Sequence, residues 1–177
     1  TEIYTLSLHD ALPIYQCPAG QFDRDADPDT PCELCNPGMQ SSEDRLRCDF
    51  CVAGRADHDS NPATNCTLCT AGKHSFMGGT ECTACERGKA DLDRSAATEC
   101  VACRAGQHSE QGSVSCMNCT AGTVDEDSDP ATLCEPCVTG RYAAEGSAQC
   151  ILCPPGWADS DSNPATPCRF CPSGTTT

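Results

Sequence analysis

Cysteines constrain this chain more than any other residue type. Nineteen of its 177 residues are Cys, and a share above about 8–10% in a short chain indicates a disulfide scaffold. From Cys17 to Cys171 the gaps follow C-x14-C-x2-C-x12-C-x2-C without exception, which gives a period of 34 residues. Each period contains a long half-repeat of 18 residues and a short half-repeat of 16 residues.

Glycine recurs at one fixed position in these half-repeats. Every cysteine that opens a half-repeat is followed by x-x-Gly, at Gly20, Gly38, Gly54, Gly72, Gly88, Gly106, Gly122, Gly140, Gly156 and Gly174. Glycine at a constant offset marks a backbone position that needs positive φ or a close chain approach. Only three to five residues separate the turn signals, which favours short strands in small hairpins.

Large apolar residues are too few to fill one core, since the chain has four Phe, three Tyr and one Trp. A compact domain of this length would bury roughly two thirds of its unfolded surface. Cross-links or metal must therefore replace burial as the main source of stability. The sequence predicts a small disulfide-rich fold, an extended rod of tandem one-disulfide loops with short β-hairpins, little helix and no single hydrophobic core.

Three segments are expected along the chain. Residues 1–14, TEIYTLSLHDALPI, contain no cysteine and look like a translated sequencing adapter, so we expect a non-native assembly artefact there. Residues 15–174 form the predicted cysteine-rich repeat array. Residues 175–177 are expected to be a truncated end of a longer protein.

The cysteine spacing leaves two chemistries open. C-x2-C-x12-C-x2-C also suits a four-cysteine zinc site, for which Cys32, Cys35, Cys48 and Cys51 would be one set. Zinc would make the regular x14 segments mere linkers and would strand Cys17 in a half-site, so disulfides are favoured. Spacing alone does not fix connectivity.

The simplest disulfide ladder joins each opening cysteine to the next cysteine along the chain. Its pairs are Cys17–Cys32, Cys35–Cys48, Cys51–Cys66, Cys69–Cys82, Cys85–Cys100, Cys103–Cys116, Cys119–Cys134, Cys137–Cys150 and Cys153–Cys168. Cys171 is left unpaired, which truncation would explain.

The short half-repeats carry a recognisable pattern. C-x-x-G-x-[YH]-S-x-x-G-x-x-x-C-x-x-C, as between Cys69 and Cys85, resembles the cysteine-rich repeat of ephrin-type receptors. It is also similar to the first, single-disulfide module of tumour-necrosis-factor-receptor-like domains. The resemblance covers residues 17–174 and implies an extracellular, elongated module with sequential one-disulfide loops. Arrays with Asp-rich long halves look most like those of algal and other protist surface proteins.

The family's aromatic residue after x-x-Gly is present only as Phe22, Tyr142 and Trp157. The ligand-binding roles of the receptor families are therefore not carried over to this chain.

The long half-repeats contain the best chemical candidates, acidic segments of the form D-x-D-x-[DN]. Alternating oxygens are what the first half of a Ca²⁺ loop supplies, although no bidentate Glu follows and Pro stands where that loop has Gly. The alternative is that Asp and Asn cap turns. The candidate Ca²⁺ ligands are Asp23, Asp25, Asp27, Asp57, Asp59, Asn61, Asp91, Asp93, Asp125, Asp127, Asp129, Asp159, Asp161 and Asn163. No other cofactor is expected.

Two N-x-[ST] sequons, at Asn65 and Asn118, are candidate glycosylation sites. No Ser/His/Asp or Cys/His arrangement can be assembled, so we do not expect an enzyme. The net charge of -15 opposes nucleic-acid binding, and no apolar run is long enough to contact a membrane as a spanning segment.

The expected partners are other extracellular proteins or matrix, and the sequence does not define an oligomeric state. The leading functional hypothesis is a structural or adhesive spacer within a larger surface or secreted protein, outside the cell or at its surface. The alternatives are a ligand-binding receptor ectodomain and an intracellular array of four-cysteine zinc sites.

Overall fold

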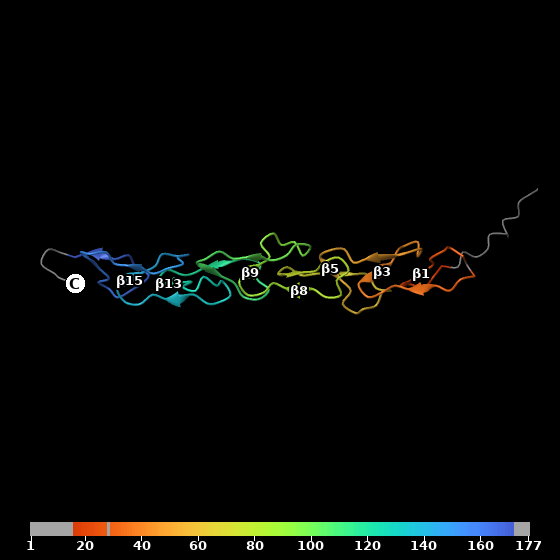
Figure 1. Ribbon diagram of the computed structural model, residues 1–177, viewed down its shortest axis with the longest axis horizontal. Coiled ribbons are helices and arrows are strands. Elements are labelled where there is room, and N and C mark those ends of the chain that lie inside the picture. Colours follow the sequence, from red (N-terminus) through yellow and green to blue (C-terminus); the bar gives the residue numbers. More distant parts are fainter. Residues whose placement is uncertain (1–15, 28, 172–177) are drawn as a thin grey trace, which may run out of the picture.

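The chain forms an extended rod in a computed structural model, which describes residues 16–27 and 29–171 (Figure 1). Nine two-stranded antiparallel sheets follow one another along the rod, and the described residues contain no helix. The predicted small disulfide-rich repeat is therefore confirmed. Since no helix is described, none of the described segments could cross a membrane as a helix. The predicted artefact at 1–14 and the predicted end at 175–177 lie outside the described residues.

The nine disulfides follow the simplest ladder, in which each opening cysteine is joined to the next cysteine. The bonds are Cys17–Cys32, Cys35–Cys48, Cys51–Cys66, Cys69–Cys82, Cys85–Cys100, Cys103–Cys116, Cys119–Cys134, Cys137–Cys150 and Cys153–Cys168. Among the residues that the structure describes, only Cys171 is free. This pairing leaves no set of four thiolates for zinc in the described part of the chain.

Each disulfide loop contains one hairpin of very short strands. The strand after the opening glycine is β1 (Gln21–Phe22), β3 (Met39–Ser41), β5 (Arg55–Ala56), β7 (Lys73–His74), β9 (Lys89–Ala90), β11 (Gln107–His108), β13 (Thr123–Val124), β15 (Arg141–Tyr142) or β17 (Trp157–Ala158). Its partner adjoins the closing cysteine and is β2 (Glu33–Leu34), β4 (Cys48–Phe50), β6 (Thr67–Leu68), β8 (Thr83–Ala84), β10 (Val101–Ala102), β12 (Met117–Asn118), β14 (Glu135–Pro136), β16 (Ile151–Leu152) or β18 (Arg169–Phe170).

The x-x-Gly motif is a tight turn that leads into the first strand of each hairpin. In the first half-repeat Gln21 N donates to the carbonyl of Pro18 at 3.1 Å, and Gly20 has φ +81°. Positive φ at the third residue is the signature of a type II turn and explains the glycine. Cys35 N then donates to the Gly20 carbonyl at 2.9 Å. The corresponding bond recurs in all nine described half-repeats.

Burial along the rod is local. The buried apolar residues are cystine cysteines and small side chains such as Ala56, Ala90 and Val124, which lie one period apart. Val124 and Ala143 pack with the Cys137–Cys150 disulfide in one small cluster. The predicted absence of a single core is confirmed for the described residues, so the cross-links carry much of the stability.

Each half-repeat contacts the next one and also the one after that. Gly54 N of a long half-repeat donates to the Ser75 carbonyl of the following short half-repeat at 2.9 Å. Two half-repeats ahead, a β-carbon on Gly54 would lie 3.0 Å from Ala97 N, and one on Gly72 would overlap the carbonyl oxygen of Gly112. The repeated glycine therefore provides both the turn and the close approach between half-repeats.

Candidate functional site

The first Asp of each acidic loop points into the junction with the preceding short half-repeat. Asp57 and Asp91 are 4% and 5% exposed. Asp57 Oδ2 accepts a hydrogen bond from Gly38 N at 2.9 Å, and Asp91 Oδ2 accepts one from Gly72 N at 3.0 Å. The same bond joins Gly106 N to Asp125 at 3.2 Å and Gly140 N to Asp159 at 3.4 Å. This carboxylate therefore links consecutive half-repeats.

The second oxygen of this carboxylate bonds to its own loop. Asp57 Oδ1 accepts from Asn61 N at 3.1 Å, and Asp91 Oδ1 accepts from Ser95 N at 3.1 Å. Asp125 differs, because its buried Oδ1 has no hydrogen-bond partner among the described residues. In the first loop Asp23 Oδ1 accepts only from nearby backbone, at Asp25 and Ala26.

The second Asp of each loop is exposed and holds the loop closed. Asp59 Oδ1 accepts from Asn61 N at 3.1 Å and from Thr64 Oγ1 at 2.9 Å. These bonds favour the carboxylate, so the Thr64 hydroxyl and then the Asn61 N–H lower the pKa of Asp59. The Thr-to-Asp bond recurs as Thr30–Asp25, Thr98–Asp93, Thr132–Asp127 and Thr166–Asp161.

The third acidic or amide residue forms the turn that the sequence predicted from Asx before Pro. Asn61 Oδ1 accepts from Ala63 N at 3.1 Å, and the Asn61 carbonyl accepts from Thr64 N at 2.9 Å. Asp129 and Asn163 make the same contact with Ala131 and Ala165. Asp27 accepts from Asp29 N in the first loop.

These bonds define what remains for a cation. Most oxygens of the predicted Ca²⁺ ligands already accept hydrogen bonds from the protein. Within the described ranges, the only three metal-type side chains that converge are His108, Cys119 and Cys134, and both sulfurs belong to one disulfide. Calcium binding stays a prediction, and the unpartnered Asp125 Oδ1 is the oxygen best placed for it.

The histidines lie against neighbouring loops. His58 Nε2 is 3.5 Å from Cys82 Sγ, and His108 Nδ1 is 3.4 Å from Cys134 Sγ. His74 packs edge-on against Phe76 with ring centroids 5.5 Å apart.

The short half-repeat at Cys35–Cys48 departs from the pattern of the other three. It has Asp44 and Arg45 where the next short half-repeat has Gly78 and Gly79. Its turn is held by side chains, because Asp44 Oδ1 accepts from the Ser42 hydroxyl and from Leu46 N. Arg45 has φ +58°.

Arg45 also replaces a backbone bond of the regular half-repeats. Its Nη1 donates to the carbonyl of Cys17. In the regular short half-repeats the equivalent carbonyl accepts from a glycine N–H, at 2.7–2.8 Å, in the pairs Gly78–Cys51, Gly112–Cys85 and Gly146–Cys119. The stacking bond is therefore kept although the donor has changed.

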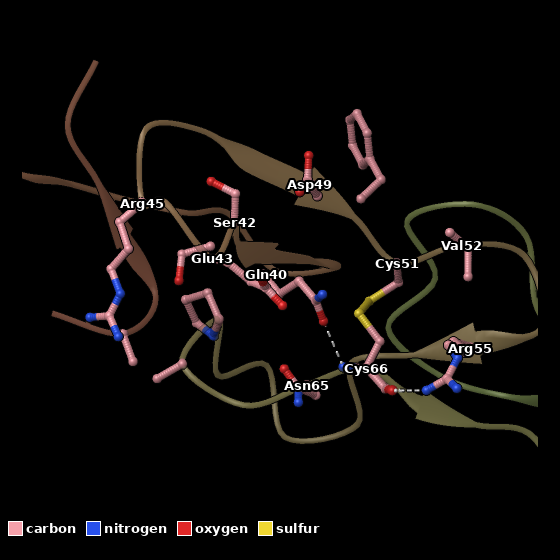
Figure 2. Close-up of a pocket in the computed structure, with 15 residues that line it drawn as sticks. Gln40, Ser42, Glu43, Arg45, Asp49, Cys51, Val52, Arg55, Asn65 and Cys66 are labelled. Atoms are coloured by element: carbon pink, nitrogen blue, oxygen red, sulfur yellow. Dashed lines mark hydrogen bonds between the residues drawn. A yellow bond between two sulfur atoms is a disulfide. The ribbon is translucent and has the colours of Figure 1, made fainter. Parts of the chain in front are cut away.

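A cavity of about 690 Å³ lies beside this divergent half-repeat (Figure 2). Gln40 Oε1 accepts from Cys66 N at 3.1 Å, and Arg55 Nη1 donates to the Cys66 carbonyl at 2.9 Å. Arg45, Asp49 and the exposed Phe50 also line it. The cavity thus combines both signs of charge with one aromatic ring.

The two sequons have different surroundings. Asn65 is exposed and lines the cavity. Asn118 lies in β12, where its amide accepts from Gln107 Nε2 at 3.0 Å and donates to Glu145 Oε1 at 3.1 Å. Both central cysteines, Cys66 and Cys119, are disulfide-bonded. Glycosylation stays a prediction at both positions.

The sequence did not reveal that the first Asp joins two half-repeats. The available signal was the constant offset of 19 residues between a short half-repeat's opening glycine and the next loop's first Asp. Geometry must carry the functional argument here, because no protein-family model matches the chain and no curated protein is significantly similar to it.

Proposed function

We propose that the array is a structural or adhesive spacer, a stalk segment of a larger extracellular or cell-surface protein. The observation that carries this proposal is the bonding between half-repeats. From Cys17 to Cys168 every consecutive pair of half-repeats shares at least one hydrogen bond, such as Gly20 N to Ser41 Oγ or Ala143 N to the Pro164 carbonyl. An array bonded at every junction resists bending and can hold its ends apart.

The covalent chemistry supports a location outside the cell. Nine disulfides in the described chain indicate an oxidising compartment. We assign the repeat to the ephrin-receptor-like and tumour-necrosis-factor-receptor-like type on its x-x-Gly turns and sequential single-disulfide loops, in the acidic form of algal and protist surface proteins. Partners would then be other extracellular proteins or matrix.

The stalk proposal is tested by measuring the height of an epitope on a cell surface. The full chain is inserted between a membrane anchor and a fluorescent tag, and a Gly/Ser linker of equal length is the control. A rod places the tag at a fixed height that exceeds the mean extension of the flexible control, which grows only with the square root of length. Equal heights with equal spread would overturn the proposal.

A ligand-binding ectodomain is the second candidate, and the cavity beside the divergent half-repeat favours it. There the regular pattern breaks, and Arg45, Arg55 and Phe50 line one hollow. Small-molecule and peptide sites commonly combine apolar walls with a few fixed polar groups. If this function is correct, Phe50→Asn would abolish binding of an extracellular partner without changing the height of the tag.

A further inference from the structure

An exposed apolar patch on the rod consists of Phe50, Phe76 and Met77. Their side chains are 55%, 60% and 71% exposed. Phe50 belongs to β4, whereas Phe76 and Met77 lie in the turn between β7 and β8. A β-carbon on Gly78 would lie 3.1 Å from the Phe50 ring, so this ring packs on the turn that carries the other two residues.

The repeat itself does not require apolar residues at these positions. Two periods further along, Phe50 and Met77 correspond to Asn118 and Glu145, which form a hydrogen bond of 3.1 Å. One period along, the three positions are Ala84, Glu110 and Gln111. The scaffold therefore folds with polar side chains at these positions, and the aromatic and thioether groups of the patch are extra to its needs.

Charge also distinguishes this region from the rest of the rod. Residues 43–55 contain three arginines, balanced by Glu43, Asp44 and Asp49, and so carry no net charge, while the whole chain carries -15. Both signs are exposed, as in the ion pair of 2.9 Å between Arg47 and Asp49. Two copies of such an acidic rod repel each other least at this neutral region.

We propose that the patch docks a second copy of this chain, with the two rods related by a two-fold axis across it. In such a pair Phe76 and Met77 of each copy contact Phe50 of the other, because a two-fold interface joins the same surface of both partners. A surface that exposes both signs of charge is complementary to itself in this arrangement. The contact is small against the roughly 1,200–2,000 Å² of stable interfaces, so the dimer is weak.

Analytical ultracentrifugation of the full chain tests this pairing over about 10 µM to 1 mM, a range suited to weak association. We expect a monomer–dimer equilibrium that tightens as salt is added, because salt screens the repulsion between two acidic rods. The double variant Phe50→Asn/Met77→Glu, which copies the Asn118–Glu145 pair, should weaken the dimer about tenfold or more. Thermal melting checks that it folds.

Leu152→Asn is the matched control, since Leu152 occupies the position of Phe50 three periods along and is 65% exposed. This variant should dimerise like the unmodified chain. A chain that stays monomeric to about 1 mM overturns the proposal, and so does a dimer that the double variant leaves intact. A monomeric rod would leave the proposed stalk function standing, because the height measurement does not depend on pairing.

Discussion

Long and short half-repeats close their loops by different means. A long loop is held by side chains, as where Asp59 accepts hydrogen bonds from Asn61 N and the Thr64 hydroxyl. A regular short loop is turned by a second glycine, such as Gly78 with φ +76°. The divergent short half-repeat uses the long type of closure, since Asp44 and Ser42 hold its turn. The rod thus conserves the bonds between half-repeats, while the means of turning each loop can change.

The opening glycines should show the largest effect, and they should separate the two classes. On Gly72 a β-carbon would overlap the backbone carbonyl of Gly112, whereas on Gly54 it would lie 3.0 Å from Ala97 N. Positive φ costs an L-residue about 1–2 kcal/mol, and overpacking adds roughly 1–3 kcal/mol. We therefore expect Gly72→Ala to destabilise the array more than Gly54→Ala, as measured by urea unfolding.

Gly140→Ala is the matched control for the φ penalty. Gly140 has φ +82°, close to the +80° of Gly72, and a β-carbon there would meet nothing within 4 Å. It should cost only the penalty of about 1–2 kcal/mol for positive φ. Equal costs for Gly72→Ala and Gly140→Ala would mean that the half-repeats do not approach as closely as described.

The buried Asp at the junction of the two classes should give the next largest effect. In Asp57→Asn one amide N–H₂ must face one of the two N–H donors, Gly38 N or Asn61 N, that the carboxylate now accepts. An unsatisfied buried donor costs about 1–3 kcal/mol, so the thermal midpoint should fall. Asp23→Asn is the control, because Asp23 bonds only within its own loop; a similar loss there would contradict the assignment.

Arg45 allows the short closure to be restored by design. Arg45→Gly removes the donor to the Cys17 carbonyl and should cost about 1 kcal/mol. The double variant Asp44→Gly/Arg45→Gly copies the Gly78-Gly79 turn, whose N–H donates to the Cys51 carbonyl at 2.7 Å. The double variant should therefore recover protection from hydrogen exchange around residues 17–32. Equal protection in both variants would show that the guanidinium bond contributes nothing.

The sequence predicted what lies within a half-repeat better than what lies between two of them. The 34-residue period identified the hairpins, the tight turn at x-x-Gly and the candidate disulfide ladder, because each depends on residues fewer than 20 apart. The bond from Gly38 to Asp57 and the approach of Gly72 to Gly112 depend on how half-repeats stack. A periodic pattern repeats at every junction and does not reveal which offset is in contact.

Arg45 could not be interpreted from the sequence for a related reason. Its departure from the glycine pattern was visible, but the function of that glycine was not, since the Cys51 carbonyl it bonds lies 27 residues before Gly78. Only the structure shows that Arg45 bonds to the corresponding carbonyl of Cys17.

Acid should act on the long loops and spare the regular short ones. Hydrogen bonds lower the pKa values of Asp25, Asp59, Asp93, Asp127 and Asp161 from the ordinary value of 3.8. A lowered pKa in the folded state gives stability that is complete above the ordinary pKa and is lost as the pH falls through the folded value. Stability should thus stay constant from neutral pH to about pH 5 and decline below about pH 4.

Carboxyl titrations by NMR measure this directly. In Thr64→Val the pKa of Asp59 should rise, because the Thr64 hydroxyl is the largest cause of its lowering, while Asp93 in the unchanged next loop serves as an internal reference. A rise in both, or in neither, would contradict the closure of the long loop by this hydroxyl.

Calcium should produce the smallest effect, and it distinguishes one long loop from the others. Where Asp57 and Asp91 use both oxygens within the protein, Ca²⁺ would have to displace existing hydrogen bonds and still find about six to eight oxygens. We therefore expect titration calorimetry at about millimolar Ca²⁺, the weak end of protein sites, to give no heat beyond dilution. A saturable heat that Asp125→Asn removes and Asp91→Asn leaves would instead establish a cation site at the unpartnered Asp125 oxygen, and would give that loop a role in addition to holding the rod together.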